Sequence, residues 1–190
     1  MPRRPDPGVE ERILSAASKL WKNGGENALT MRAVAKAAGT NTPAVYRRFP
    51  SREALLHALL RRVQQQVADA VRPSQSPEEA CERYLDFALS HPHEYELFYD
   101  HAYQLPLPGR SGRTVALREH RPTMAFMEAK LAERLGGSPE DHTRLSLALW
   151  AITHGTATIL ISKSIPAEHA SELRSVLSSA VKAMIRNASV

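Results

Sequence analysis

Apolar residues recur every three or four positions along most of the chain, which is the spacing of amphipathic helices. The pattern is clearest over residues 13–21, 56–67 and 173–185. Glycine is sparse, with 9 in 190 residues, and runs of β-branched residues are few. The sequence therefore predicts an all-α protein.

Prolines, glycines and hydroxyl-bearing residues divide this pattern into about nine helices. Gly24-Gly25 ends the first helix, Ser51 caps the fourth, and residues 76–79 (SPEE) open the fifth with a capping box. Pro122 should kink or restart the seventh helix, because proline lacks the amide that an interior position needs. We expect helices at about 7–23, 31–38, 42–49, 51–72, 77–90, 92–104, 113–135, 139–162 and 167–186.

Two of these helices, at 31–38 and 42–49, are short and joined by a tight turn. Thr30 and Asn41 are expected to cap them, because each side chain can accept a hydrogen bond from a first-turn amide. Gly39 suits the left-handed conformation in which the first of the two helices ends. The pair is interpreted as a helix-turn-helix whose second helix enters a DNA major groove. The alternative is an αα-hairpin within an ordinary helical bundle.

The net charge of +5 is unevenly distributed along the chain. Residues 1–72 contain 13 Lys and Arg against 6 Asp and Glu, whereas residues 73–190 contain 12 against 14. The basic surplus therefore coincides with the helix-turn-helix. This coincidence favours phosphate binding over a merely solvated charged face.

The segment from Tyr46 to Leu56, YRRFPSREALL, resembles the Y-x-x-F-x-S-K-E-x-L-L signature of the TetR family of bacterial repressors. Residues 35–39 (AKAAG) resemble the A-x-x-A-G turn of that family. The first helix of the family is matched by Ile13, Ala16, Ala17, Leu20 and Gly24. The resemblance covers roughly residues 9–60. Residues 41–44 (NTPA) depart from the S-x-G-T that the family often has there, so the base-reading edge of this member is its own.

The resemblance implies a helix-turn-helix DNA-binding domain at 1–52, followed by a helical ligand-binding and dimerisation domain at 53–190. Within the second domain, Trp150, His154 and Gly155 are spaced W-x-x-x-H-G. This spacing resembles the C-terminal domain of one TetR subgroup that is named for those three residues.

The residues expected to contact DNA lie in and around the helix-turn-helix. Tyr46 can donate to a phosphate, and Arg47 and Arg48 can reach a phosphate or a guanine edge. For Arg48, a solvated charge near a helix C-terminus is an equal alternative. The resemblance places Arg52 at the phosphate-contacting lysine of the family. The full predicted set is Thr30, Arg32, Thr40, Asn41, Thr42, Pro43, Ala44, Tyr46, Arg47, Arg48 and Arg52.

Aromatic and methionine side chains with nearby polar groups predict a small-molecule pocket in the second domain. The predicted lining is Phe98, Tyr99, Tyr103, Met124, Met127, Trp150 and His154. The alternative is that these residues are plain core, with His154 bonded to a backbone carbonyl. The resemblance implies that such a ligand releases the protein from its operator.

The apolar stripe over residues 173–185 is too long for the surface helix of a monomer, and residues 145–161 are apolar nearly all round. We therefore predict a two-fold dimer through these two helices, which would demand a near-palindromic operator. The predicted interface residues are Leu173, Val176, Leu177, Ala180, Val181 and Met184. Residues 145–161 include His154 and three threonines, which favours a buried helix over a membrane span.

No catalytic or metal-binding pattern stands out in the sequence. His91, His93 and His101 cluster near Asp100, but His93 and His101 lie two helical turns apart and would not both reach one ion. No H-E-x-x-H, paired cysteine, G-x-S-x-G or P-loop motif occurs. The prediction is therefore no enzyme activity, no cofactor and no metal.

The single cysteine, Cys81, excludes an internal disulfide, and no signal peptide pattern opens the chain. Together these features indicate a cytoplasmic protein. The predicted function is a homodimeric transcriptional repressor that a small-molecule effector releases from double-stranded DNA, with no membrane partner. The alternatives are a helical enzyme or metal-binding bundle, and a nonspecific architectural DNA-binding protein.

Overall fold

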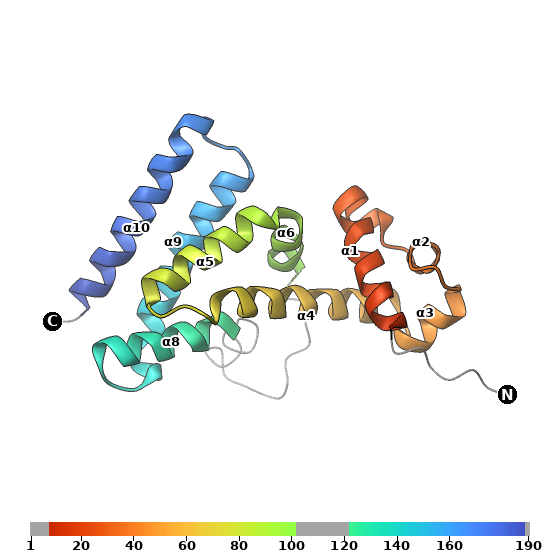
Figure 1. Cartoon of the computed structure of the whole chain (residues 1–190), viewed down its shortest axis with the longest axis horizontal. Coiled ribbons are helices and arrows are strands. Elements are labelled where there is room, and N and C mark those ends of the chain that lie inside the picture. The colour runs from red at the N-terminus through yellow and green to blue at the C-terminus, as the bar shows by residue number, and fades with distance from the viewer. Residues whose placement is uncertain (1–7, 102–121, 189–190) are drawn as a thin grey trace. The chain divides into compact units, whose positions relative to one another are not determined.

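The computed structural model describes residues 8–101 and 122–188 (Figure 1). Within these ranges it contains nine α-helices, two short 3-10 helices and no strand, which confirms the predicted all-α fold. The α-helices are α1 (Val9–Ala28), α2 (Met31–Ala37), α3 (Thr42–Arg48), α4 (Arg52–Val71), α5 (Pro77–Ser90), α6 (Pro92–His101), α8 (Pro122–Leu135), α9 (Thr143–Ile161) and α10 (Ala170–Asn187). The 3-10 helices are η2 (Pro139–His142) and η3 (Ala167–His169).

The helices form two compact units. Of the described residues, 8–63 and 96–101 belong to the first unit, and 64–95 and 122–188 belong to the second. Both α4 and α6 therefore contribute residues to each unit. The domain boundary expected between residues 52 and 53 stays a prediction, since the division between the compact units falls within α4 instead.

In the first unit, α1, α2, α3 and the first half of α4 surround one apolar core. Val45 and Phe49, which we expected to pack inward from the second short helix, are both buried. A salt bridge of 2.8 Å between Arg62 of α4 and Glu11 of α1 joins the two longer helices at their edge. Helices α2 and α3 are too short to be stable alone, so this scaffold holds them in place.

The ends of the short helices are set by local hydrogen bonds. Thr30 Oγ1 accepts from the Ala33 amide at 3.2 Å, and Asn41 Oδ1 accepts from the Ala44 amide at 2.9 Å. Gly39 has a φ of +63°, a conformation that side chains disfavour. The caps and the turn are therefore those that the sequence predicts.

Helix α1 is broken where glycines were expected to end it. Gly24 and Gly25 leave the helical conformation, and Gly25 has a φ of +59°. The chain then makes one further helical turn, as far as Ala28. The sequence pattern did not predict this extra turn.

In the second unit, α5 packs against α8, α9 and α10, and α9 also packs against α8 and α10. Helix α8 begins at Pro122, so the proline acts as a helix start. The part of the predicted seventh helix at 113–121 lies outside the described residues. Residues 139–142 form the 3-10 helix η2 rather than the first turn of α9, although the Ser138 amide donates to Asp141 Oδ2 at 2.8 Å as a capping box requires.

Helix α9 differs from the buried helix that we expected. Among the described residues, the stretch Pro139–Ile161 is the one helix whose length and composition would suit a membrane span. Only 28% of its apolar window is buried inside the protomer. Ala151 and Ile159 are exposed, so the described part of the chain leaves one apolar face of this helix uncovered.

Candidate DNA-binding surface and ligand cavity

Helix α3 buries one side and exposes the other. Val45 is fully buried, whereas Tyr46 is 49% exposed and Arg47 and Arg48 are also exposed. Arg48 lies 3.9 Å from Glu10 of α1, a distance at which a surface ion pair contributes about 0–1 kcal/mol at most. The exposed side of α3 therefore carries one phenol and two guanidinium groups that can meet an acidic partner.

The remaining predicted DNA contacts also lie at the surface of the first unit. Thr30, Arg32, Asn41 and Pro43 are exposed, and Thr40, Thr42 and Ala44 are half-buried. Residues 40–44 thus lie together at the start of α3, whereas Thr30 and Arg32 lie at the start of α2. The side-chain oxygens of Thr30 and Asn41 already accept bonds from helix amides, so for these two residues a direct base contact is the least supported of the set.

Arg52 has a role that the family motif did not suggest. Its Nε donates to the Leu29 carbonyl at 2.8 Å, and its Nη2 donates to the Glu26 carbonyl at 2.9 Å. The Glu26 carboxylate accepts from Nη1 and Nη2 at 3.2 and 3.1 Å. One guanidinium therefore satisfies carbonyl groups at the end of α1 and ties them to the first turn of α4. The phosphate contact of Arg52 stays a prediction.

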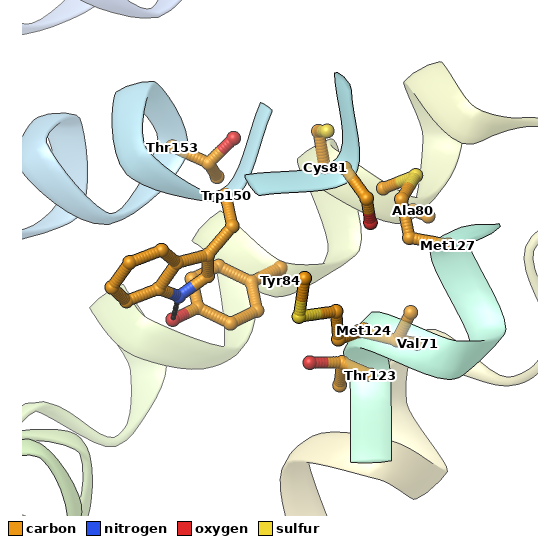
Figure 2. Close-up of a pocket in the computed structure, with 10 residues that line it drawn as sticks. Val71, Ala80, Cys81, Tyr84, Thr123, Met124, Met127, Trp150 and Thr153 are labelled. Carbon is orange, nitrogen blue, oxygen red and sulfur yellow. Dashed lines mark hydrogen bonds between the residues drawn. The ribbon is translucent and has the colours of Figure 1, made fainter. Parts of the chain in front are cut away.

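A cavity lies among α4, α5, α8 and α9 of the second unit (Figure 2). The centre of a water molecule can occupy about 30 Å³ of it, which is room for one or two waters. None of the described side chains in its wall is charged. The wall is formed by Val71, Ala80, Cys81, Tyr84, Thr123, Met124, Met127, Ser146, Trp150 and Thr153.

The predicted pocket residues divide into two groups. Met124, Met127 and Trp150 line the cavity, and His154 stacks on Trp150 with ring centroids 5.1 Å apart. Phe98 and Tyr99 are not among its lining residues and belong to the first unit, so their place in a ligand pocket stays a prediction. Phe98 is buried there as core. Tyr103 lies outside the described residues.

Several cavity residues were missed from the sequence, although their spacing carried a signal. Ser146 lies four residues before Trp150 and Thr153 lies three after it, so all three share one face of α9. Cys81 and Tyr84 are likewise three apart on α5. No local feature shows that these two faces meet, since that depends on how the helices pack.

A chain of hydrogen bonds holds the aromatic wall of the cavity. Trp150 Nε1 donates to Tyr84 Oη at 3.2 Å, a bond drawn in Figure 2, and Tyr84 Oη lies 3.2 Å from Tyr95 Oη. Tyr95 Oη in turn lies 2.5 Å from His154 Nδ1. The indole ring therefore has a fixed position on one side of the cavity.

The hydroxyl of Ser146 is an exception among the buried polar groups of this wall. Ser146 is 1% exposed, and its Oγ has no hydrogen-bond partner in the described part of the chain. The hydroxyls of Thr153 and Thr156, on the same helix, donate to backbone carbonyls at 2.7 and 2.9 Å. A buried hydroxyl without a partner costs about 1–3 kcal/mol of stability.

The thiol of Cys81 also faces the cavity, near the two methionines (Figure 2). Burial raises its pKa to about 11, and a hydrogen bond with Thr153 opposes this shift only in part. The thiol therefore stays protonated at neutral pH, and a protonated thiol is a poor nucleophile. Cys81 contributes a small polarisable surface to the wall.

Helix α10 uses its apolar stripe within the protomer. Leu177 is 5% exposed and Val181 is buried, and both face α5 across a groove of about 260 Å³. Val176 points away and is 57% exposed, while Leu173, Ala180 and Met184 are half-buried. Leu177 and Val181 are thus buried within the protomer, and their place in a dimer interface stays a prediction. The groove is lined by Glu78, Cys81, Glu82, Leu85, Arg174, Ser175, Leu177, Ser178 and Val181.

The clustered histidines are placed against aromatic rings. His91 stacks on Phe87 with centroids 4.7 Å apart, and His101 meets the edge of Trp21 at 5.2 Å. Within the described residues, no group of three or more His, Cys, Asp or Glu side chains is arranged to hold a metal ion.

Comparison with known proteins gives matches at both ends of the chain. The model for bacterial regulatory proteins of the tetR family matches residues 13–59, and the model for the tetracyclin repressor-like C-terminal domain matches residues 77–184. The comparison with curated proteins gives no match. The subgroup suggested by the Trp-His-Gly spacing stays a prediction.

Solved structures with a similar fold cover nearly the whole chain. The regulatory protein SCO4313 is 21% identical, with a TM-score of 0.71 over 99% of this chain and 98% of that one. A transcriptional regulator from Rhodococcus sp. Rha1 is 22% identical, with a TM-score of 0.66 over 95% and 98%. The multidrug binding protein EbrR, solved in complex with imidazole, is 21% identical, with a TM-score of 0.61 over 97% and 93%.

Proposed function

The chain belongs to the tetR family of bacterial regulatory proteins, and from that premise we propose that it is a homodimeric repressor released from its operator by a small molecule. As a member of this family it is a DNA-binding transcriptional regulator and not an enzyme. The repressor sense, the dimer, the ligand-driven release and a cytoplasmic location are our proposal. The observation that carries it is that one compact unit exposes a basic helix-turn-helix, while the other contains a cavity whose described lining side chains are uncharged.

For the DNA contact, we propose that α3 enters a major groove by its N-terminal turn. Thr42, Pro43 and Ala44 open this helix and are small enough for close approach to base edges. Tyr46 and Arg47, further along the exposed side, are suited to phosphate oxygens. Residues 42–44 would then read bases, and the later residues would set the position of the helix.

For the dimer, the uncovered face of α9 is the main support. Ala148, Ala151 and Gly155 lie three and four residues apart on this helix and are exposed or half-buried. A methyl group added at Gly155 would meet nothing within 4 Å. The protomer alone therefore gives no reason for a helical glycine, which costs roughly 0.5–1 kcal/mol relative to alanine. A second α9 crossing closely at Gly155 would supply the reason and would cover the apolar face.

For the ligand, the cavity walls and the relatives point the same way. The fold of EbrR accommodates imidazole in a solved structure, which supports the idea that this architecture binds small ring compounds. At 21% identity that likeness concerns the fold, so the ligand class must be inferred from the residues of this chain.

The DNA-binding part can be tested by selecting duplexes from a random pool with the full-length protein. We expect a near-palindromic site with half-sites about 34–36 Å apart. In fluorescence anisotropy, that site should resist competition by random DNA by a factor of about 10³ or more. Random DNA that competes as well as the selected site would instead identify an architectural DNA-binding protein.

The ligand part can be tested by measuring operator affinity with and without a compound that binds the cavity. A coupling of about 1–3 kcal/mol would lower operator affinity by roughly 5–150-fold. A compound that binds the cavity and leaves operator affinity unchanged would contradict ligand-driven release while leaving the DNA-binding function intact.

A further inference from the structure

The unpaired Ser146 hydroxyl identifies the point at which the cavity offers a hydrogen bond. Two neighbouring polar groups of the wall on the same helix are already engaged: Trp150 donates to Tyr84, and Thr153 donates to the Leu149 carbonyl. The hydroxyl of Thr123 belongs to a residue that is only half-buried. Ser146 Oγ lines the same cavity, is buried, and has no partner in the described part of the chain. A hydroxyl can donate one hydrogen bond and accept others. A molecule in the cavity can therefore gain a bond here without breaking one in the protein.

The absence of charge in the wall sets a second condition. The ten lining side chains are apolar, hydroxyl-bearing or thiol-bearing, or carry an indole. Burying an ionised group without a charged partner is strongly unfavourable. The thiol of Cys81 does not change this condition, since it stays protonated at neutral pH. The described wall therefore offers no charged partner to a carboxylate or an ammonium group.

The movable side of the cavity indicates the shape of the ligand. Trp150 is fixed by its bond to Tyr84, so expansion must come from the opposite wall. Met124 and Met127 form that wall from the first two turns of α8. Methionine has three rotatable bonds, and its sulfur makes favourable contacts with aromatic rings. A flat aromatic body between Trp150 and the methionines satisfies both sides.

We propose that the effector is a small, uncharged aromatic molecule with one hydroxyl or carbonyl group that hydrogen-bonds to Ser146 Oγ. This inference rests on the proposed function, because it names the ligand class of the same cavity. Ser146 is the anchor of the polar group, and Met124 and Met127 move aside to admit the ring. Selectivity then comes from one hydrogen bond and from the exclusion of charge.

Three probes of matched size test this proposal by calorimetry on the full-length protein: benzyl alcohol, toluene and benzoate. Ligands of this size bind proteins with dissociation constants in about the micromolar to millimolar range. We expect benzyl alcohol to bind about 3–10-fold more tightly than toluene, as one net hydrogen bond provides. Benzoate should not bind measurably.

Ser146→Ala should lower the affinity for benzyl alcohol to that for toluene and leave toluene unchanged. The same variant should melt no lower than the wild type, because it removes a buried hydroxyl that has no partner. Ser178→Ala, in the groove between α5 and α10, is the matched control and should leave all three affinities unchanged.

Three results would overturn the proposal. In the first, benzoate binds as tightly as benzyl alcohol. In the second, the wild type and Ser146→Ala have equal affinity for benzyl alcohol. In the third, no probe binds at millimolar concentration. Operator binding, measured on the same preparations, separates this inference from the function on which it rests. Retained operator specificity with any of these results removes the ligand class alone, whereas loss of operator specificity removes the proposed function.

Discussion

The two compact units satisfy their polar groups in opposite ways. In the first unit, Thr30, Asn41 and Ser51 each accept a hydrogen bond from an amide three residues ahead. The side chains on the exposed side of α3 face solvent. In the second unit, the phenol, indole and imidazole groups of Tyr84, Tyr95, Trp150 and His154 bond to one another. Trp150 bonds to a tyrosine 66 residues away in sequence, and His154 bonds to one 59 residues away.

This difference explains how each unit can change. The position of a polar group whose partner lies in the same helical turn is determined by the local sequence. A substitution on the exposed side of α3 should therefore alter DNA recognition with little effect on folding. The position of a polar group whose partner lies on another helix is determined by how the helices pack. A substitution around Trp150 should therefore alter both the cavity and the stability of the unit. The first unit can vary its surface, and the second can vary its cavity only with compensation elsewhere.

The largest expected effect concerns α10, where an inward and an outward position are neighbours in sequence. Leu177→Glu should unfold the second unit, because it buries a carboxylate against α5 at a cost of more than about 3 kcal/mol. Val176→Glu, at a position 57% exposed, should keep the fold and weaken the proposed dimer. Circular dichroism and analytical ultracentrifugation measure the two properties separately. A folded, monomeric Leu177→Glu protein would restore this residue to the dimer interface.

The next effect concerns the clamp formed by Arg52 on the end of α1. Arg52→Gln removes bonds to two carbonyls and one carboxylate, which should destabilise the first unit by about 1–2 kcal/mol after allowance for partial exposure. Glu26→Gln should act in the same direction and weaken operator binding. If Arg52 instead served a phosphate, removing the acidic neighbour would strengthen binding. Operator affinity of Glu26→Gln at several salt concentrations therefore distinguishes the two roles by its sign.

A smaller effect concerns the exposed side of α3. Arg47→Ala should lower the affinity for operator and for random duplex alike by about tenfold. It should also reduce the salt dependence of binding by about the amount that one phosphate contact contributes. Thr42→Val should change the preferred base and leave random-duplex binding unaltered. Anisotropy titrations of both variants against both duplexes provide the comparison. Equal losses on the two duplexes from Thr42→Val would remove Thr42 from the base-reading set.

The same contrast explains which features the sequence could predict. Helix starts at Thr30, Asn41 and Ser51, and the break at Gly24-Gly25, follow from residues within a few positions, and the structure confirms them. The helical class and the helix-turn-helix follow from the same local patterns.

Features that depend on packing between helices were less well predicted. An apolar stripe on α10 has the same spacing whether α5 or a second chain covers it, so the sequence alone could not show that Leu177 is buried within the protomer. Phe98 has the composition of a pocket residue but lies in the other unit. Arg52 reaches a carboxylate 26 residues away, which no local motif encodes.

The smallest expected effect concerns Cys81. The burial of its thiol can be measured as a dependence of protein stability on pH. The folded protein raises the pKa of this thiol from 9.0 to about 11, mainly by burial. The folded state therefore holds the proton more tightly than the unfolded chain, and the resulting stabilisation is present below pH 9 and lost as the pH rises towards 11. Urea unfolding of wild type and Cys81→Ala should show a difference in stability that falls by about 1 kcal/mol between pH 8 and pH 10. Because other groups titrate equally in both proteins, their contributions cancel in this difference. Parallel curves over that range would mean that the thiol meets solvent in the folded protein, through the cavity or through the groove between α5 and α10 that it also lines.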